Sequence, residues 1–132
     1  MARILIVEDD VFLRYALGEW LRLEDYDVME AASADEAAAI LASPAVVDLV
    51  ITDVQMPGSM DGLELARRIR ADRPAIAVIV VSGWAASADI QDLGFSAFFR
   101  KPYDFEQLSA QIATLALDQN AQAETRRQVG DE

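Results

Sequence analysis

Three stretches of this chain are apolar at almost every position, and each leads directly into a polar side chain. They cover residues 3–7, 49–52 and 77–81. A strand with one exposed face alternates apolar and polar residues, so these runs indicate strands that are buried on both faces, as in a parallel sheet. Two weaker strand-like runs, residues 27–31 and 97–100, bring the number to five, and the second suits an edge strand.

Helical patterns separate most of these strands. Between residues 11 and 23, apolar side chains recur at i, i+4, i+7 and i+8, which predicts one core-facing stripe; they are Leu13, Leu17, Trp20 and Leu21. Ser33, Asp61 and Asp104 suit helix N-caps, with helices to about residues 42, 70 and 117. Residues 84–93 lack a clear stripe and predict at most a short fourth helix. Repeated strand–helix alternation predicts an α/β fold, a doubly wound parallel sheet of five strands with helices on both faces.

Length and composition indicate one domain. With 132 residues and a 53% hydrophobic fraction, the chain can form one core but not two. We expect the domain to span residues 1–118 and the polar residues 119–132 to be a frayed or disordered tail. No apolar stretch reaches the roughly 20 residues of a membrane span, and no signal sequence is evident, so we expect a cytoplasmic protein with no membrane partner.

The chain contains no cysteine and no histidine, and its net charge is strongly negative. The absence of Cys and His excludes disulfides, thiolate chemistry, Cys-ligated zinc and histidine as a general base. A net charge of −12 repels phosphate backbones, so we expect no direct nucleic-acid binding. Chemistry in this chain must use carboxylates, hydroxyls, lysine and the backbone.

Polar residues that could take part in a reaction or bind a ligand follow four of the predicted strands. They are Glu8, Asp9, Asp53, Ser82 and Lys101. In an open α/β sheet, ligands bind outside the carboxyl ends of the strands, so these side chains converge if the first, third and fourth strands are neighbours. At 4 Å and an effective dielectric near 20, each pair of carboxylates repels by about 4 kcal/mol. Mg²⁺ with oxygen ligands, together with Lys101, would balance that charge.

Five motifs, in this order, resemble the receiver domain of two-component response regulators. They are Ile4–Asp10, Thr52–Pro57, Asp61-Gly62, Val81–Gly83 and Lys101-Pro102. The resemblance covers residues 2–117 and implies a flavodoxin-like fold with strand order 2-1-3-4-5.

The resemblance also implies a role for each site residue. Asp53 would be phosphorylated by a sensor histidine kinase or a phosphotransfer protein, and Glu8 and Asp9 would hold Mg²⁺ together with the backbone carbonyl of Gln55. Lys101, followed by a cis bond to Pro102, would pair with the phosphoryl group. Ser82 and Phe98 would be the switch residues, and phosphorylation would change binding to a downstream protein that the sequence does not name.

Three features depart from the family pattern. Phe98 lacks the hydroxyl of the usual tyrosine, Ser59 is an additional residue in the loop after Asp53, and the stretch between Ser82 and Lys101 is short. The leading interpretation is a stand-alone receiver that is not an enzyme, beyond catalysing its own phosphorylation and dephosphorylation. The alternatives are a receiver excised from a hybrid kinase or longer regulator, a pseudo-receiver, and a haloacid-dehalogenase-like phosphatase, although Gln55 stands where the last would need an aspartate.

Overall fold

The computed structural model describes residues 2–83 and 95–116, which contain a five-stranded parallel sheet. The strands are β1 (Arg3–Val7), β2 (Asp27–Ala31), β3 (Leu49–Asp53), β4 (Ala77–Ser82) and β5 (Ala97–Arg100). Their order in the sheet is β2-β1-β3-β4-β5, and every neighbouring pair is parallel. The predicted doubly wound fold with strand order 2-1-3-4-5 is therefore confirmed.

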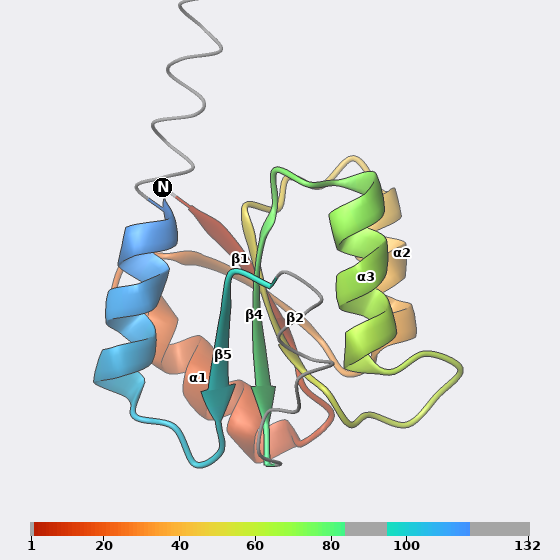
Figure 1. The fold of residues 1–132 in the computed structure, drawn as a ribbon. Helices are drawn as coiled ribbons and strands as arrows, with labels where there is room; N and C mark the ends of the chain where they lie inside the picture. The colour runs from red at the N-terminus through yellow and green to blue at the C-terminus, as the bar shows by residue number, and fades with distance from the viewer. Residues whose placement is uncertain (1, 84–94, 117–132) are drawn as a thin grey trace, which may run out of the picture.

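Helices cover both faces of the sheet. The helices are α1 (Val11–Leu23), α2 (Ala34–Ala42), α3 (Gly62–Asp72) and a last helix over residues 105–116. Figure 1 shows α2 and α3 on one face, with α1 and the last helix on the other. All strands end at the same edge of the sheet, at the bottom of that view, where the loops leading to the helices gather.

The core consists of two apolar layers, one on each face of the sheet. Leu5, Val50 and Val78 contribute to the layer under α2 and α3, whereas Ile4 and Ile79 contribute to the layer under α1 and the last helix. Successive strand residues therefore point into opposite layers. This explains why the central strands lack polar alternation, since full burial of each such side chain contributes about 1.5–3 kcal/mol.

Side-chain caps fix where the helices begin. Asp10 accepts hydrogen bonds from two amides of the first turn of α1, and Ser33 and Asp61 each accept one, from Glu36 in α2 and from Glu64 in α3. Asp104 accepts hydrogen bonds from the amides of residues 106 and 107. The three caps predicted at residues 33, 61 and 104 are present. The cap at Asp10 places α1 directly after the acidic pair.

Two details of the helices differ from expectation. Leu13 was expected in the buried stripe of α1 but is 46% exposed, while Leu17 and Leu21 are buried. Leu13 lies in the first turn of α1, at the carboxyl edge of the sheet where the loops gather (Figure 1). Helix α3 runs to Asp72, two residues beyond the expected end, and stops just before Pro74, which disfavours helical backbone at the residue preceding it.

Some predictions fall on residues that the structure does not describe. The expected short fourth helix at residues 84–93, and the expected domain end and polar tail at residues 118–132, lie outside the described residues. Among the helices of residues 2–83 and 95–116, none combines the length and the apolar character needed to cross a membrane.

Candidate phosphorylation site

Three carboxylates meet at the carboxyl edge of the sheet. Strands β1 and β3 are neighbours, with Val7 paired to Thr52, so the next residues, Glu8 and Asp53, leave the sheet side by side. Asp9 follows on the turn into α1. One oxygen from each of the three carboxylates lies within 4.8 Å of the others. Glu8 is 6% and Asp53 8% exposed, whereas Asp9 is exposed to solvent, so the acidic group is open to solvent on the side of Asp9.

Lys101 joins two of these carboxylates. Its Nζ donates to Glu8 Oε1 at 2.7 Å and to Asp53 Oδ2 at 2.9 Å. The backbone N–H of Lys101 donates to the Ser82 carbonyl at 2.8 Å, which continues the pairing of β5 with β4 and directs the side chain toward β3. The peptide bond between Lys101 and Pro102 is cis, as the resemblance implied.

The shared burial changes the protonation of the site. Burial raises the pKa of Glu8 from its usual 4.5 to about 7; the bond from Lys101 opposes this rise, and the neighbouring Asp53 adds to it. Burial lowers the pKa of Lys101, but its bonds to Glu8 and Asp53 outweigh that effect, so the net shift is upward. Lys101 therefore stays charged, and the acidic pocket lacks enough positive charge without a cation.

One atom of Glu8 indicates where a cation would bind. Oε1 is bonded to Lys101, but Oε2 is buried and has no hydrogen-bond partner among the described residues. A buried carboxylate oxygen without a partner is costly. The oxygen-only donor set of Glu8, Asp9 and Asp53 suits a hard divalent ion such as Mg²⁺.

Backbone packing fixes the position of Asp53. The Thr52 hydroxyl donates to the Asp53 carbonyl at 3.0 Å, and the Val54 N–H donates to the Val81 carbonyl at 3.1 Å. Gly62, the first residue of α3, lies so close that a Cβ there would overlap the Asp53 carbonyl oxygen. The Asp-Gly pair thus combines a helix cap with the close backbone approach that only glycine permits.

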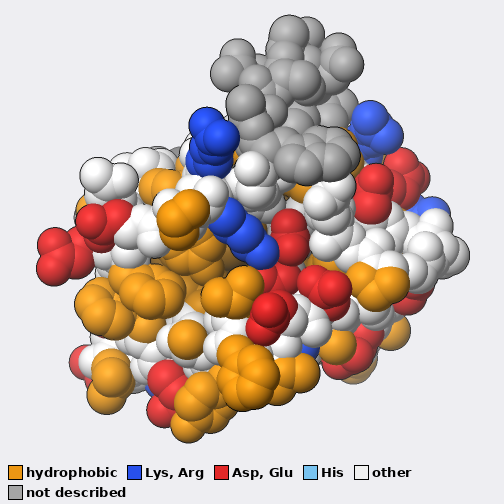
Figure 2. Space-filling model, turned by 90° about the horizontal axis from the view of Figure 1, so that it is seen from below, with side chains coloured by type: hydrophobic (Ala, Val, Ile, Leu, Met, Phe, Trp, Pro, Cys, Tyr) orange, Lys and Arg blue, Asp and Glu red, His pale blue; other side chains and the backbone are white. Residues whose placement is uncertain are grey.

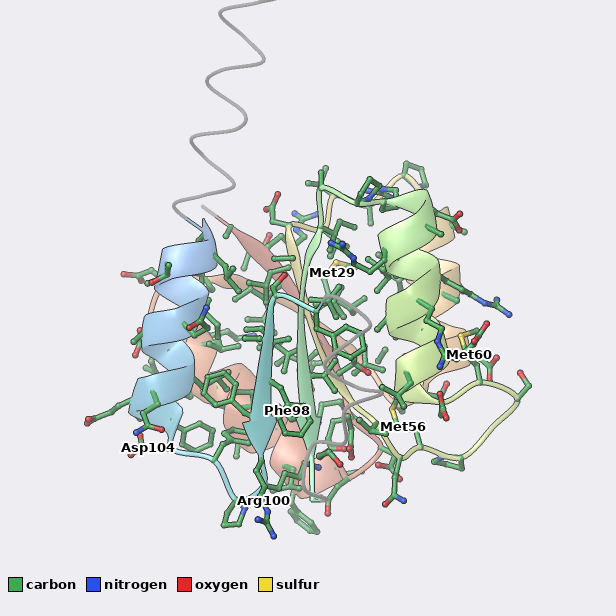
Figure 3. All side chains as sticks on the ribbon, viewed as in Figure 1. Met29, Met56, Met60, Phe98, Arg100 and Asp104 are labelled. Atoms are coloured by element: carbon green, nitrogen blue, oxygen red, sulfur yellow. The ribbon has the colours of Figure 1, made fainter. Side chains whose placement is uncertain are left out.

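The remaining predicted residues occupy different positions around the site. Ser82 ends β4 and is buried, one residue beyond the pair formed by Asp53 and Val81. The N–H of Gln55 donates to Asp53 Oδ1 at 3.4 Å, so its backbone starts the loop beside the acid. Phe98 pairs with Val80 in the edge strand β5 and packs, half-buried, against the core layer under α2 and α3 (Figure 3).

The sequence interpretation missed three side chains around the site. Arg14 Nη1 donates to the Glu8 carbonyl at 2.8 Å, and this contact depends on how α1 folds back, which leaves no local signal. Tyr103 is half-buried within electrostatic reach of Lys101, and its partial burial raises the pKa of its hydroxyl. Asp10 could have been identified, because an aspartate just before a helical pattern is a standard N-cap signal.

Residues 4–113 match the family described as the response regulator receiver domain. The chain belongs to that family. Receiver domains are phosphoacceptor signalling modules of two-component systems, and the five-stranded fold with its acidic pocket agrees with this assignment. The phosphatase alternative is not favoured.

Relatives place the receiver domain both alone and within longer proteins. This chain is 33% identical over 109 residues to the sporulation initiation phosphotransferase F of Bacillus subtilis, and the match covers 80% of this chain and 86% of the relative. It is 38% identical over 115 residues to the sensor kinase CckA of Brucella abortus, covering 84% of this chain but 12% of the kinase. In a cyclic di-GMP phosphodiesterase of Thermotoga maritima, at 33% identity, the match covers 83% of this chain and 29% of the relative.

Solved structures show the same fold. A CheY-like receiver domain from Methanospirillum hungatei superimposes with a TM-score of 0.84 at 29% identity, covering 92% of this chain and 98% of the other. The response regulator TrrA of Thermotoga maritima, solved in complex with Mg²⁺ and BeF, gives a TM-score of 0.80 at 31% identity, covering 87% and 99%.

Proposed function

We propose that Asp53 of this receiver takes a phosphoryl group from the phosphohistidine of a sensor histidine kinase or of a phosphotransfer protein. A carboxylate oxygen of Asp53 attacks phosphorus in line, the P–N bond of the donor breaks, and the imidazole leaves and is neutralised by a proton from water. The observation that carries this proposal is the hydrogen bond between the buried Asp53 carboxylate and Lys101, with Glu8 and Asp9 beside it.

Mg²⁺ would be held by the carboxylates of Glu8, Asp9 and Asp53 and by the backbone carbonyl of Gln55. When bound, it neutralises negative charge on the transferring oxygens. The partnerless Oε2 of Glu8, judged among the described residues, supports a cation here, as does the solved complex of TrrA with Mg²⁺ and BeF.

The chain's own side chains would then act on the transferred group. Lys101 can move its hydrogen bond from Asp53 to a phosphoryl oxygen, keeping the same charge balance. Ser82, at the end of the neighbouring strand, would donate its hydroxyl to another phosphoryl oxygen, and Phe98 on β5 would respond by repacking. The receiver thereby catalyses its own phosphorylation and dephosphorylation and acts as an enzyme on no other substrate.

The surface beside the site suits a docked donor protein. Four large hydrophobic side chains at the start of α1 are exposed: Val11, Phe12, Leu13 and Tyr15. Figure 2 looks onto this end of the molecule and shows hydrophobic side chains gathered beside acidic ones. Contiguous exposed apolar side chains mark interaction sites more often than isolated ones do. We call these four residues the α1 patch and infer that the phosphodonor protein contacts it.

Phosphorylation would signal by changing the binding of a downstream protein of unknown identity, without direct nucleic-acid binding. Because phosphohistidine is made from ATP, the same proposal places the protein in the cytoplasm.

Intact-mass measurement after incubation with Mg²⁺ and acetyl phosphate tests the proposal. The wild type should gain one phosphoryl group, and Asp53→Ala should gain none at that site. Mg²⁺ removal by a chelator should abolish the gain in the wild type. A wild type that stays unmodified, or an Asp53→Ala protein labelled as fast as the wild type, would sink the proposal.

A further inference from the structure

The loop between β3 and α3 is tied to the first turn of α2 by two hydrogen bonds. Ser59 donates its hydroxyl to Asp35 Oδ1 at 2.6 Å and its backbone N–H to Asp35 Oδ2 at 3.2 Å. A single loop residue therefore uses both oxygens of this carboxylate. The contact joins residues 24 positions apart in the sequence, so α2 holds a loop that belongs to a distant part of the chain.

The backbone of the same loop is shaped to fit Asp35. Gly58 has φ of +117°, a conformation that side-chain-bearing residues rarely adopt. A Cβ on Gly58 would also lie 2.7 Å from Asp35 Oδ2. The glycine allows the loop to pass directly over the carboxylate before Ser59 binds it.

Other polar contacts hold the loop at its two ends. At its start, Gln55 N–H reaches Asp53 Oδ1, and at its end Asp61 caps α3. Met60 is buried just before that cap, and Figure 3 shows it beside α3. Within the part of the chain that the structure describes, the bonds from Ser59 to Asp35 are the only polar contacts made by residues 56–59.

We propose that Asp35 is a positioning residue for metal binding at the phosphorylation site and that it acts through Ser59. The proposal rests on the function proposed above, in which the backbone carbonyl of Gln55 is a metal ligand. A loop that is already ordered places this carbonyl before the ion arrives, whereas a loop without the tether must be ordered at the cost of binding free energy. The additional residue Ser59 is thus the tether that holds the longer loop.

The tether and the charge of Asp35 can be separated by mutation. Asp35→Ala removes both the hydrogen bonds and a negative charge, and the lost charge alone would weaken attraction for a cation. Ser59→Ala removes the hydroxyl bond and leaves every charge in place. Ser59→Thr keeps a hydroxyl and should restore the bond. Ser33→Ala is the matched control, because it removes one hydrogen bond at the same end of α2 without touching the loop.

The experiment measures the thermal midpoint of the full chain against Mg²⁺ concentration, with no phosphodonor present. Binding to the folded state raises this midpoint, so the titration yields an apparent dissociation constant. We expect Ser59→Ala and Asp35→Ala to weaken Mg²⁺ binding by about three- to tenfold, as loss of one or two exposed hydrogen bonds would. Ser59→Thr and Ser33→Ala should bind as the wild type does, although Ser33→Ala lowers the midpoint at every Mg²⁺ concentration.

A second readout separates positioning from chemistry. With acetyl phosphate, Ser59→Ala should need more Mg²⁺ to reach half its maximal rate but reach the wild-type rate at saturation. If Ser59→Ala binds Mg²⁺ as tightly as the wild type, the positioning role is wrong while the phosphorylation of Asp53 stands. If Mg²⁺ stabilises the wild type and the variants show the expected weakening, yet Asp53 is never phosphorylated, the proposed function fails and the tether stands.

Discussion

The protonation of Glu8 depends on its burial and on the charges beside it, Lys101 and Asp53. Its pKa of about 7 in the metal-free protein lies above the usual value of 4.5, chiefly because of burial. For a carboxyl whose folded-state pKa is raised, the contribution to stability is full below pH 4.5 and is lost as the pH rises to about 7. Metal-free protein near neutral pH therefore carries a buried acid that gains from a cation.

This shift predicts a pH dependence of Mg²⁺ binding. A metal ligand must be deprotonated, so binding below pH 7 has to displace the proton of Glu8. We expect the apparent dissociation constant for Mg²⁺ to be about tenfold larger at pH 6 than at pH 8. It is measured from the Mg²⁺-dependent rise in the thermal midpoint. Glu8→Gln should bind Mg²⁺ more weakly than the wild type at both pH values. Its dissociation constant should no longer depend on pH between 6 and 8. A wild-type constant that is the same at both pH values would contradict the raised pKa.

At the scale of elements, α1 has two apolar ends with different surroundings. Phe12 is 85% exposed in the α1 patch beside the proposed phosphorylation site, and Leu23 is 82% exposed at the opposite end of the helix. The two side chains are similar in exposure and in hydrophobic character. They differ in their distance from the pocket, since α1 begins at the carboxyl edge of the sheet (Figure 1).

This difference makes a matched pair of variants. We expect Phe12→Ser to slow phosphotransfer from the phosphorylated donor protein by about tenfold or more, as loss of an interface anchor typically does. Phosphorylation by acetyl phosphate should be unchanged, because that donor needs no docking surface. Leu23→Ser should leave both rates at the wild-type value. Equal slowing with the protein donor and with acetyl phosphate would show instead that Phe12 supports the pocket itself.

The junction of β3 and α3 depends on the close approach of Gly62 to Asp53. A Cβ at Gly62 would overlap the Asp53 carbonyl oxygen, so Gly62→Ala must displace either the helix or the strand end. We expect it to lower the free energy of unfolding by about 2 kcal/mol or more, measured by urea denaturation. At Gly83 no described atom lies within 4 Å of the added Cβ, so Gly83→Ala should change stability much less. Equal losses in the two variants would argue against the tight junction.

At the scale of the whole molecule, the sheet could be predicted because burial on both faces leaves a direct mark on sequence. The runs at β1, β3 and β4 have no polar alternation because neighbouring residues enter two separate core layers. Glu8 directly follows β1, and Asp53 and Ser82 end β3 and β4, so parallel topology alone brings these residues to one edge. Pattern and spacing were therefore enough to predict that these side chains meet at one edge.

Contacts across distant loops could not be predicted in this way. The bonds of Arg14 to the Glu8 carbonyl and of Ser59 to Asp35 depend on the paths of turns, which hydrophobic periodicity does not encode. Leu13 was assigned to the core for a related reason. Periodicity shows which face of α1 is apolar, but not how far along the helix that face is buried: Leu17 and Leu21 are buried, while Leu13 in the first turn is exposed.

The central claim is that Asp53, and no other carboxylate, is the phosphoacceptor of a site balanced by Lys101. Borohydride reduction after phosphorylation with acetyl phosphate and Mg²⁺ converts an acyl phosphate into an alcohol, which peptide mass spectrometry can locate. The predicted result is a single reduced position, Asp53, that is lost when Mg²⁺ is withheld. Reduction at Glu8, Asp9 or another acidic residue in place of Asp53 would contradict the claim.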